Sequence, residues 1–189
     1  MRNFWLSSLF LFLIGCGPSA ATLVTKQYQR TAFITVVCDG IGVGSGVVIA
    51  PDYVLTAAHV VDCEDGLMVV ATETYDGLAT VVTRNSERDL AKLYVPGIRG
   101  PSVEIGPAPS PGDTVCLSPA YPRRDRKCGE VYFERGDGPN NRIRFSAKVE
   151  PGNSGSGLYD SDGRLVGIVT QYEYGKFGIT GGAASPLRE

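Results

Sequence analysis

From Thr31 onward the chain consists of short segments rich in Val, Thr and Ile, which turn residues separate from one another. The first series reads TAFITVV, GVVIA, LMVVAT, LATVVT and LAKLYV, and a second reads DTVCLS, CGEVYFER, RIRFSAKV, GLYD and RLVGIVTQY. Between the two series lies a stretch dense in Pro and Gly, PGIRGPSVEIGPAPSPGD. β-Branched residues favour strands, and turns at this spacing favour barrels or sandwiches over βαβ units. The sequence therefore predicts an all-β fold.

Composition narrows the possible functions. The chain has 189 residues, which is enough for one domain or two small, closely packed ones. Hydrophobic residues make up 43% of it, so a proper core is expected. The formal net charge is −2, which gives no support for nucleic-acid binding. The sequence holds one histidine and no ligand cluster, so we expect no metal and no cofactor.

The first residues resemble an export signal. A short positive start precedes the apolar run Phe4–Ile14, which is too short to span a bilayer comfortably but fits a secretory h-region. The run ends in Leu-Ile-Gly-Cys, which resembles the bacterial lipobox and implies lipidation of Cys16 after removal of residues 1–15. A plain signal peptide and an uncleaved anchor are the alternatives. We expect an exported, membrane-anchored lipoprotein on the periplasmic or cell-surface face, with residues 16–30 as a tether.

Three polar residues are candidates for catalysis. His59 is the single histidine, Asp89 lies where a polar turn enters a strand, and Ser154 lies in VEPGNSGSGLYD. Each has an ordinary explanation: a surface or core histidine, a turn-capping aspartate, and a serine in a glycine-rich turn. In the order His, Asp, Ser, however, they match the chain order of chymotrypsin-like proteases.

Three motifs carry a more specific resemblance, which covers about Thr31 to Thr180. GSGVVIAPDYVLTAAHVV resembles the segment that presents the catalytic histidine in trypsin-like proteases. RDLAKLYV and PGNSGSGLYDSDGRLVGIVT resemble the aspartate strand and the nucleophile loop of the HtrA-like and glutamyl-endopeptidase-like branches. The resemblance implies two six-stranded antiparallel β-barrels, 31–108 and 109–185, with the active site between them.

The resemblance also implies roles for the candidate residues. Ser154 would attack a peptide carbonyl of a protein or peptide substrate and form an acyl-enzyme, His59 would transfer the proton, and Asp89 would orient the imidazole. The backbone N–H groups of Gly152 and Ser154 would stabilise the oxyanion. The rival interpretation is a catalytically inert protease-like lipoprotein that acts as a binding module.

The residue before the nucleophile bears on activation. In trypsin-like proteases made as zymogens, an aspartate there pairs with a newly formed N-terminal ammonium. Here the position holds Asn153, which is neutral. We therefore expect local packing to set the oxyanion loop without a cleavage step.

Two groups of residues are candidates for substrate recognition. By the resemblance, Thr170 would hydrogen-bond the catalytic aspartate, and Thr170, Gln171 and Tyr172 would form the edge that pairs with substrate backbone. An ordinary strand is the alternative.

Lys148 lies six residues before Ser154, where trypsin-like proteases often form the floor of the primary specificity pocket. It would favour an acidic substrate side chain. The alternative is that Lys148 points to solvent and that Val149, Phe177 and Gly178 line the pocket.

Four cysteines remain besides Cys16, and they allow three disulfide pairings. Two of them, Cys38 and Cys63, flank the His59 segment, where trypsin-like proteases often carry a bridge. The other two bracket LSPAYPRRDRK, which we interpret as a hairpin. We predict the pairs Cys38–Cys63 and Cys116–Cys128. The basic residues in this second loop, Arg123, Arg124, Arg126 and Lys127, are expected to form a solvated tip, with an interaction patch as the alternative.

Overall fold

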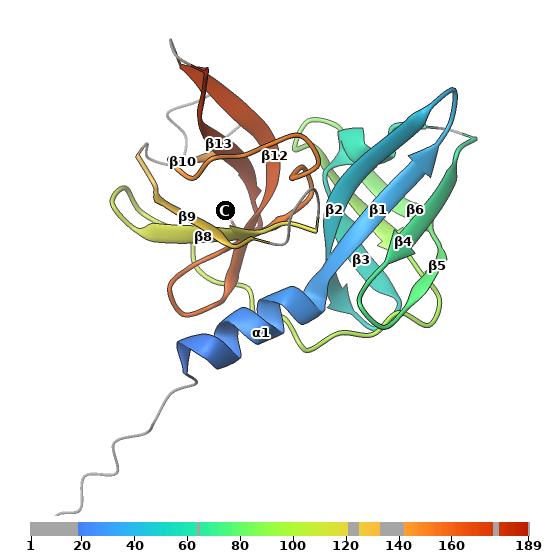
Figure 1. Cartoon of the computed structure of the whole chain (residues 1–189), viewed down its shortest axis with the longest axis horizontal. Helices are drawn as coiled ribbons and strands as arrows, with labels where there is room; N and C mark the ends of the chain where they lie inside the picture. The colour runs from blue at the N-terminus through green and yellow to red at the C-terminus, as the bar shows by residue number, and fades with distance from the viewer. Residues whose placement is uncertain (1–18, 64, 121–124, 133–141, 176–177, 189) are drawn as a thin grey trace, which may run out of the picture.

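The computed structural model describes residues 19–63, 65–120, 125–132, 142–175 and 178–188. Within them, two antiparallel sheets lie side by side, and each curls into a barrel (Figure 1). A single α-helix, α1 (Ala20–Arg30), runs below the second barrel and leads directly into the first (Figure 1). The all-β, double-barrel fold that the sequence predicts is confirmed.

In the first barrel, the part of the chain that the structure describes forms seven strands and one short 3₁₀ helix. They are β1 (Thr31–Val37), β2 (Ile41–Ala50), β3 (Tyr53–Thr56), η1 (Ala58–Val61), β4 (Leu67–Ala71), β5 (Asp76–Leu78), β6 (Thr80–Asn85) and β7 (Leu90–Tyr94), with the sheet order β5-β4-β1-β2-β3-β7-β6. Only Ala79 separates β5 from β6, and its N–H donates to the carbonyl of Met68 (3.0 Å). One bent stretch therefore pairs with β4 at one end and β7 at the other, which closes the barrel and accounts for seven strands where six were expected.

The described residues of the second barrel form six strands. They are β8 (Thr114–Ser118), β9 (Lys127–Glu130), β10 (Ile143–Phe145), β11 (Gly157–Tyr159), β12 (Leu165–Gly175) and β13 (Gly178–Pro186), with the sheet order β10-β13-β12-β11-β8-β9. An isolated bridge between Val131, just after β9, and Phe145 on β10 joins the two ends of the sheet. The described strands therefore form a closed barrel here as well.

Each barrel has its own hydrophobic core, and a third cluster lies between them. The first core contains Ile34, Val54 and Leu93, and the second contains Leu117 and Phe145. The third cluster joins Val47 of β2 to Tyr159, Leu165 and Ile168 of β11 and β12, and all four side chains are buried. Burial of apolar area across this junction fixes the two barrels against each other.

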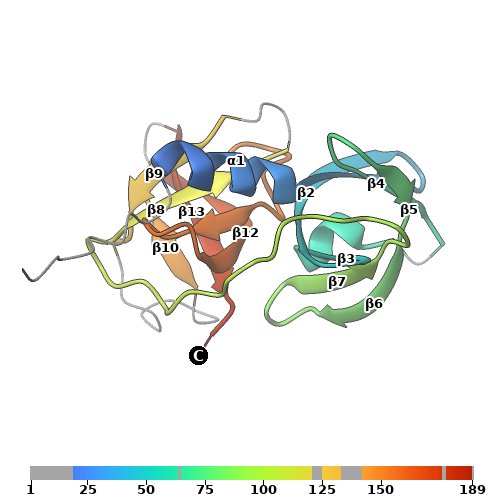
Figure 2. The same ribbon diagram turned by 90° about the horizontal axis from the view of Figure 1, so that it is seen from below.

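Helix α1 corrects the expectation that residues 16–30 form a tether. The Ser19 hydroxyl accepts from the Thr22 N–H (3.3 Å), which is an N-cap of the preferred type. Leu23 packs close to Gly163 of the β11–β12 turn, and the side chain of Gln27 reaches Ser118 of β8 (3.4 Å). The helix therefore lies against the second barrel, as Figure 2 shows from below. No described helix is long and apolar enough to cross a membrane.

The structure contains both predicted cysteine pairs. Cys38 pairs with Cys63 (Cα–Cα 6.4 Å), which ties the β1–β2 turn to the segment after η1. Cys116 and Cys128 pair across β8 and β9, where they are direct cross-strand neighbours (Cα–Cα 4.1 Å). The first bridge lies close to the catalytic candidate His59, and the second adjoins Lys127 of the basic segment.

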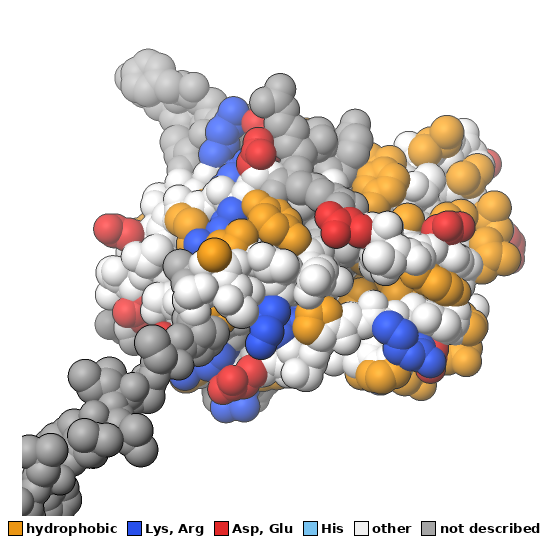
Figure 3. Space-filling view, turned by 60° about the horizontal axis from the view of Figure 1, so that its bottom comes forward, with side chains coloured by type: hydrophobic (Ala, Val, Ile, Leu, Met, Phe, Trp, Pro, Cys, Tyr) orange, Lys and Arg blue, Asp and Glu red, His pale blue; other side chains and the backbone are white. Residues whose placement is uncertain are grey.

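The large exposed hydrophobic side chains lie mainly on the first barrel. Of the nine identified among the described residues, seven belong to it: Val37, Ile41, Val43, Leu67, Leu78, Val82 and Tyr94. In the view of Figure 3, orange side chains gather over this barrel, whereas Lys and Arg are scattered. The apolar part of the outer surface is therefore concentrated on one half of the molecule.

Candidate active site

Asp89 and His59 meet at the first turn of η1. Ring Nδ1 of His59 lies 2.8 Å from Asp89 Oδ2, and the His59 backbone N–H donates to Oδ1 (2.9 Å). An ionised carboxylate only accepts hydrogen bonds, so Nδ1 carries the proton and Nε2 is left as the acceptor. This is the tautomer in which Nε2 can take a proton from a nucleophile.

The backbone of Asp89 is shaped for this contact. Its φ is +51°, a left-handed value that Asp tolerates better than most residues. Its carbonyl accepts from the Ala58 N–H (3.2 Å), so the residue binds the start of η1 through both main chain and side chain. Partial burial alone would raise the pKa of the Asp89 carboxyl. The two hydrogen bonds from His59 and the charge of Arg142 outweigh that effect and hold the pKa below its ordinary value.

Ser154 lies in a tight loop packed against the first barrel. At the next residue, Gly155, φ is +86°, and a Cβ there would lie 1.9 Å from the carbonyl oxygen of Ser45 and 2.3 Å from Thr56 Oγ1. Only glycine fits such a position. The Gly155 N–H donates to the carbonyl of Val169 on β12 (2.7 Å), so the loop is held from the side of the second barrel as well.

Strand β2 brings the two halves of the site together. The Ser45 N–H donates to the carbonyl of Ser154 (2.8 Å), and the Ser45 hydroxyl donates to the carbonyl of Gly152 (2.9 Å). A Cβ at the preceding Gly44 would lie 2.5 Å from a methyl of Val60 and 3.3 Å from the Ser154 carbonyl oxygen. The segment that carries His59 and the loop that carries Ser154 therefore both contact β2, at Gly44 and Ser45.

Ser45, which holds the Ser154 loop through two hydrogen bonds, is a residue that sequence reasoning missed. Its flanking glycines, in Gly44-Ser45-Gly46, were a signal for close backbone approach.

Asn153 is fully buried and organises the Ser154 loop. Its Oδ1 accepts from the Glu150 N–H (3.0 Å) and from Lys127 Nζ (3.2 Å). Its own N–H donates to the Glu150 carbonyl (2.9 Å). The side chain of Lys127 is 20% exposed and pairs with Glu150 (2.6 Å), so the expectation of a solvated basic tip is wrong for Lys127. Arg123 and Arg124 lie outside the described residues.

Thr170 has partners other than the expected one. Its hydroxyl accepts from Nη1 of the buried Arg142 (2.6 Å) and donates to the carbonyl of Ala183 (3.3 Å). A hydroxyl has one proton, so none is left for Asp89. Burial lowers the pKa of the Arg142 guanidinium, and the negative charge of Asp89 opposes that effect. Arg142, which sequence reasoning did not identify, therefore hydrogen-bonds Thr170, and its positive charge lowers the pKa of Asp89.

The remaining candidates for substrate recognition are exposed. β11 pairs with β12 only as far as Ile168, and Gln171 and Tyr172 lie beyond that point with exposed side chains. The Lys148 side chain is 64% exposed, and its Nζ lies 3.1 Å from Glu150 Oε1. Phe177 and the lipidation candidate Cys16 lie outside the described residues.

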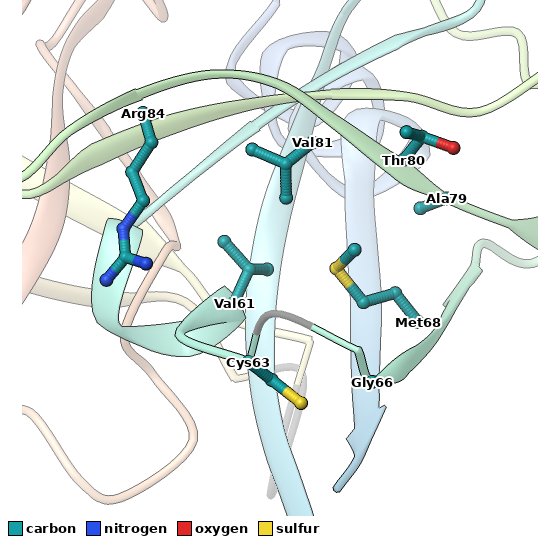
Figure 4. A pocket seen from close by; sticks show the side chains of 8 residues that line it. All are labelled: Val61, Cys63, Gly66, Met68, Ala79, Thr80, Val81 and Arg84. Carbon is teal, nitrogen blue, oxygen red and sulfur yellow. The ribbon is translucent and has the colours of Figure 1, made fainter.

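Two hollows flank η1. One, of about 340 Å³, borders His59 and Val60 together with Cys38 and Cys63. The other, of about 430 Å³, opens at the end of the first barrel. There the side chains of Val61, Val81 and Met68 approach one another, with Arg84 at one side (Figure 4). Because only the first hollow touches a triad candidate, it is the one that adjoins the site.

Similar proteins agree with this architecture. Serine protease Rv3671c of Mycobacterium tuberculosis (strain ATCC 25618 / H37Rv) is 32% identical over 146 residues, covering 70% of this chain and 36% of that protein. A probable periplasmic serine endoprotease DegP-like of Marinomonas sp. (strain MWYL1) is 29% identical over 175 residues, covering 88% of this chain and 35% of that protein. The chain thus spans about a third of the length of these curated relatives.

The fold has close counterparts among solved structures. An HtrA-type protease, AlgW with tripeptide, superposes with a TM-score of 0.78 at 27% identity, covering 90% of this chain and 60% of that one. A family model described as the trypsin-like peptidase domain matches residues 44–168, about two thirds of the sequence. The chain therefore belongs to the trypsin-like peptidase domain family.

Proposed function

We propose that this chain is a serine endopeptidase that hydrolyses peptide bonds through His59, Asp89 and Ser154. The observation that carries the proposal is the paired contact of the Asp89 carboxylate with the ring and the backbone N–H of His59. A structural aspartate has no need of both bonds, whereas a general base needs both its tautomer and its position fixed.

The proposed reaction uses the chain's own groups at every step. Ser154 Oγ attacks the carbonyl carbon while its proton passes to His59 Nε2, and the N–H groups of Gly152 and Ser154 stabilise the oxyanion. The amine leaves with the proton from Nε2, and an acyl-enzyme ester remains. Water, deprotonated by the same nitrogen, then releases the acid and restores the serine. Asp89 stabilises the imidazolium in both halves.

The proposed substrate is an extended stretch of protein or peptide. It would add as a strand to the edge of β12 at Thr170, Gln171 and Tyr172, a binding mode in which main-chain hydrogen bonds provide affinity. The tripeptide in the similar HtrA-type structure supports peptide as the ligand class. We leave Lys148 out of this proposal because its ammonium is exposed and already pairs with Glu150.

The proposed location is outside the cytoplasm. Periplasmic DegP-like relatives support export, and the lipobox-like end of the apolar run supports lipid attachment at Cys16. Labelling of the protein with a radioactive fatty acid in its host, lost on Cys16→Ala, tests the anchor separately from the activity.

Asp89→Asn tests the proposed role of the aspartate. The amide would donate to Nδ1 and stabilise the wrong imidazole tautomer, so kcat for peptide hydrolysis should fall by about 10⁴ while KM changes little. Steady-state kinetics on the purified full chain measure this, and circular dichroism checks folding. A folded Asp89→Asn protein with kcat within tenfold of the parent would rule out this mechanism.

A further inference from the structure

We infer that Lys127 is a positioning residue for the oxyanion loop, which its ammonium holds in the form needed for catalysis. The inference rests on the proposed function and names a residue that the triad does not include. Lys127 lies at the start of β9, and its Nζ binds Glu150 Oε2 (2.6 Å) and Asn153 Oδ1 (3.2 Å). One cation therefore contacts the residues on both sides of Pro151-Gly152.

The ammonium itself is fixed by the second barrel. Lys127 pairs with Leu117 across β8 and β9, and the next residue, Cys128, is bridged to Cys116. Its side chain is only 20% exposed, and the Asn153 that it contacts is fully buried. Hydrogen bonds from a charged donor are shorter and stronger than neutral ones, and more so away from water. The contact is therefore a fixed anchor and differs from an exposed surface ion pair.

Gly152, whose N–H is proposed to stabilise the oxyanion, lies between the two anchor points. Its φ is +89°, and its carbonyl accepts from the Ser45 hydroxyl (2.9 Å). Glu150 and Asn153 also bind each other, through the Glu150 N–H to Oδ1 and the Asn153 N–H to the Glu150 carbonyl. Lys127 adds a hydrogen bond to each of these two residues, so its loss loosens the turn that orients the Gly152 N–H.

The charge of Lys127 is matched to this position. Its hydrogen bond, followed by that of Lys148, lowers the pKa of Glu150 to about 2, so Glu150 is ionised at any neutral assay pH. Asn153 is neutral, so Lys127 faces one carboxylate here and donates its other bond to an amide oxygen. No chain cleavage is needed to generate this ammonium, because a lysine side chain carries it from the outset.

Lys127→Met in the full chain tests the inference, with Arg99→Met as the matched control. Arg99 also forms a 2.6 Å ion pair, with Asp52, but it is 61% exposed and lies in the segment that follows β7. In Lys127→Met we expect kcat to fall by about tenfold to a hundredfold, less than the loss of an oxyanion donor outright. KM should stay within about threefold, because Lys127 does not belong to the β12 edge. Lys127→Arg should recover most of kcat, and Arg99→Met should match the parent.

Two further readouts separate positioning from general stability. Affinity for a peptide boronate, which mimics the tetrahedral intermediate, should fall in parallel with kcat in Lys127→Met. Amide hydrogen exchange in a peptide spanning residues 150–155 should accelerate, while exchange in β4 and β7 stays unchanged. An unchanged kcat together with unchanged loop exchange would overturn the inference, as would a loss that Lys127→Arg does not restore at all.

Glu150→Gln provides a second route if Lys127→Met does not fold. It keeps the side-chain volume but removes one charged anchor of Lys127, and kcat should fall by about threefold to tenfold. A kcat equal to that of the parent in this variant would overturn the inference. Failure of the proposed function looks different, because the parent protein would then hydrolyse no peptide while loop exchange still responded to Lys127→Met.

Discussion

Asp89 connects the start of β7 to η1, the short helix that carries His59. Its carbonyl and both carboxylate oxygens bind the start of η1, while its left-handed backbone turns the chain into β7. η1 has no side-chain cap of its own, because its N-cap residue is Ala57. Asp89 therefore satisfies donors at the start of this short helix with its carbonyl and Oδ1, and it orients the His59 ring with Oδ2.

Gly155 offers a sharp test of how the Ser154 loop packs. Gly155→Ala places a methyl group 1.9 Å from the Ser45 carbonyl oxygen at φ +86°. Gly112 is the matched control, because its φ is +87° and no atom lies within 4 Å of its Cβ position. Gly112→Ala should cost about 1 kcal/mol from backbone strain alone. Gly155→Ala should cost at least about 3 kcal/mol more, because backbone must move.

Urea denaturation of both glycine variants measures the difference. Equal losses in the two would show that β2 does not press against the loop as described.

Glu150 predicts the sign of a pH effect on stability. Its folded-state pKa of about 2 lies below the ordinary value of 4.5, chiefly because of Lys127. Such a group stabilises the fold fully above the unfolded-state pKa, and the contribution is lost as pH falls through the folded-state pKa. Glu150→Gln should therefore be less stable than the parent at pH 6, and the gap should shrink steadily between about pH 4.5 and pH 2.

Thermal unfolding of Glu150→Gln and the parent across this pH range provides the measurement. A gap that stays constant or widens on acidification would contradict the assigned ion pair.

For single residues, the sequence identified candidates through motifs that need a particular residue type. It missed residues whose contacts depend on which side chains pack beside them. His59 and Asp89 are hydrogen-bonded to each other and the four cysteines pair as expected, while the catalytic roles of His59 and Asp89 stay predictions. Lys127 looked like part of a solvated basic run because three arginines precede it closely. Only the pairing of β9 with β8 turns its side chain toward Asn153, and no local pattern encodes that pairing.

Among the elements, β13 lies beyond the predicted strand segments, and α1 forms where a tether was expected. Its more buried side chains follow a helical spacing, Leu23, Val24, Gln27, Tyr28 and Arg30, but two of the five are strongly polar. The apolar residues of this segment therefore do not recur at the regular spacing that predicts an amphipathic helix. Arg30 donates to the carbonyls of Pro101 and Ser102 in the segment between the barrels, which accounts for its burial.

Thr25→Pro tests whether α1 is part of the folded unit. An 11-residue helix is not stable alone in water, so α1 persists because it is docked. Proline at the exposed centre removes a backbone hydrogen bond and clashes with the preceding turn, which should lower the free energy of unfolding by about 3 kcal/mol. Thr25→Ala, the control, should change it by less than about 0.5 kcal/mol.

Urea unfolding followed by fluorescence measures both helix variants. A Thr25→Pro protein as stable as the parent would mean that α1 contributes nothing to the fold.

For the whole molecule, the two barrels serve the site in different ways. The first supplies Asp89, His59 and strand β2 with Ser45, whereas the second supplies the Ser154 loop and its anchor Lys127. The buried cluster of Val47 with Tyr159, Leu165 and Ile168 fixes the two halves relative to each other. The short strands predicted an all-β fold, and the resemblance to trypsin-like proteases implied the two barrels. The sequence did not predict the cluster that aligns them, because those side chains come from positions far apart in the chain.

Labelling with a fluorophosphonate tests the central claim most directly. This probe reacts only with a serine that an adjacent base activates. We expect the purified full chain to carry one adduct, mapped by mass spectrometry to Ser154. Ser154→Ala should carry none, and labelling of Asp89→Asn should be slower by orders of magnitude. A folded parent protein with no adduct, or with its adduct on a different serine, would contradict the account.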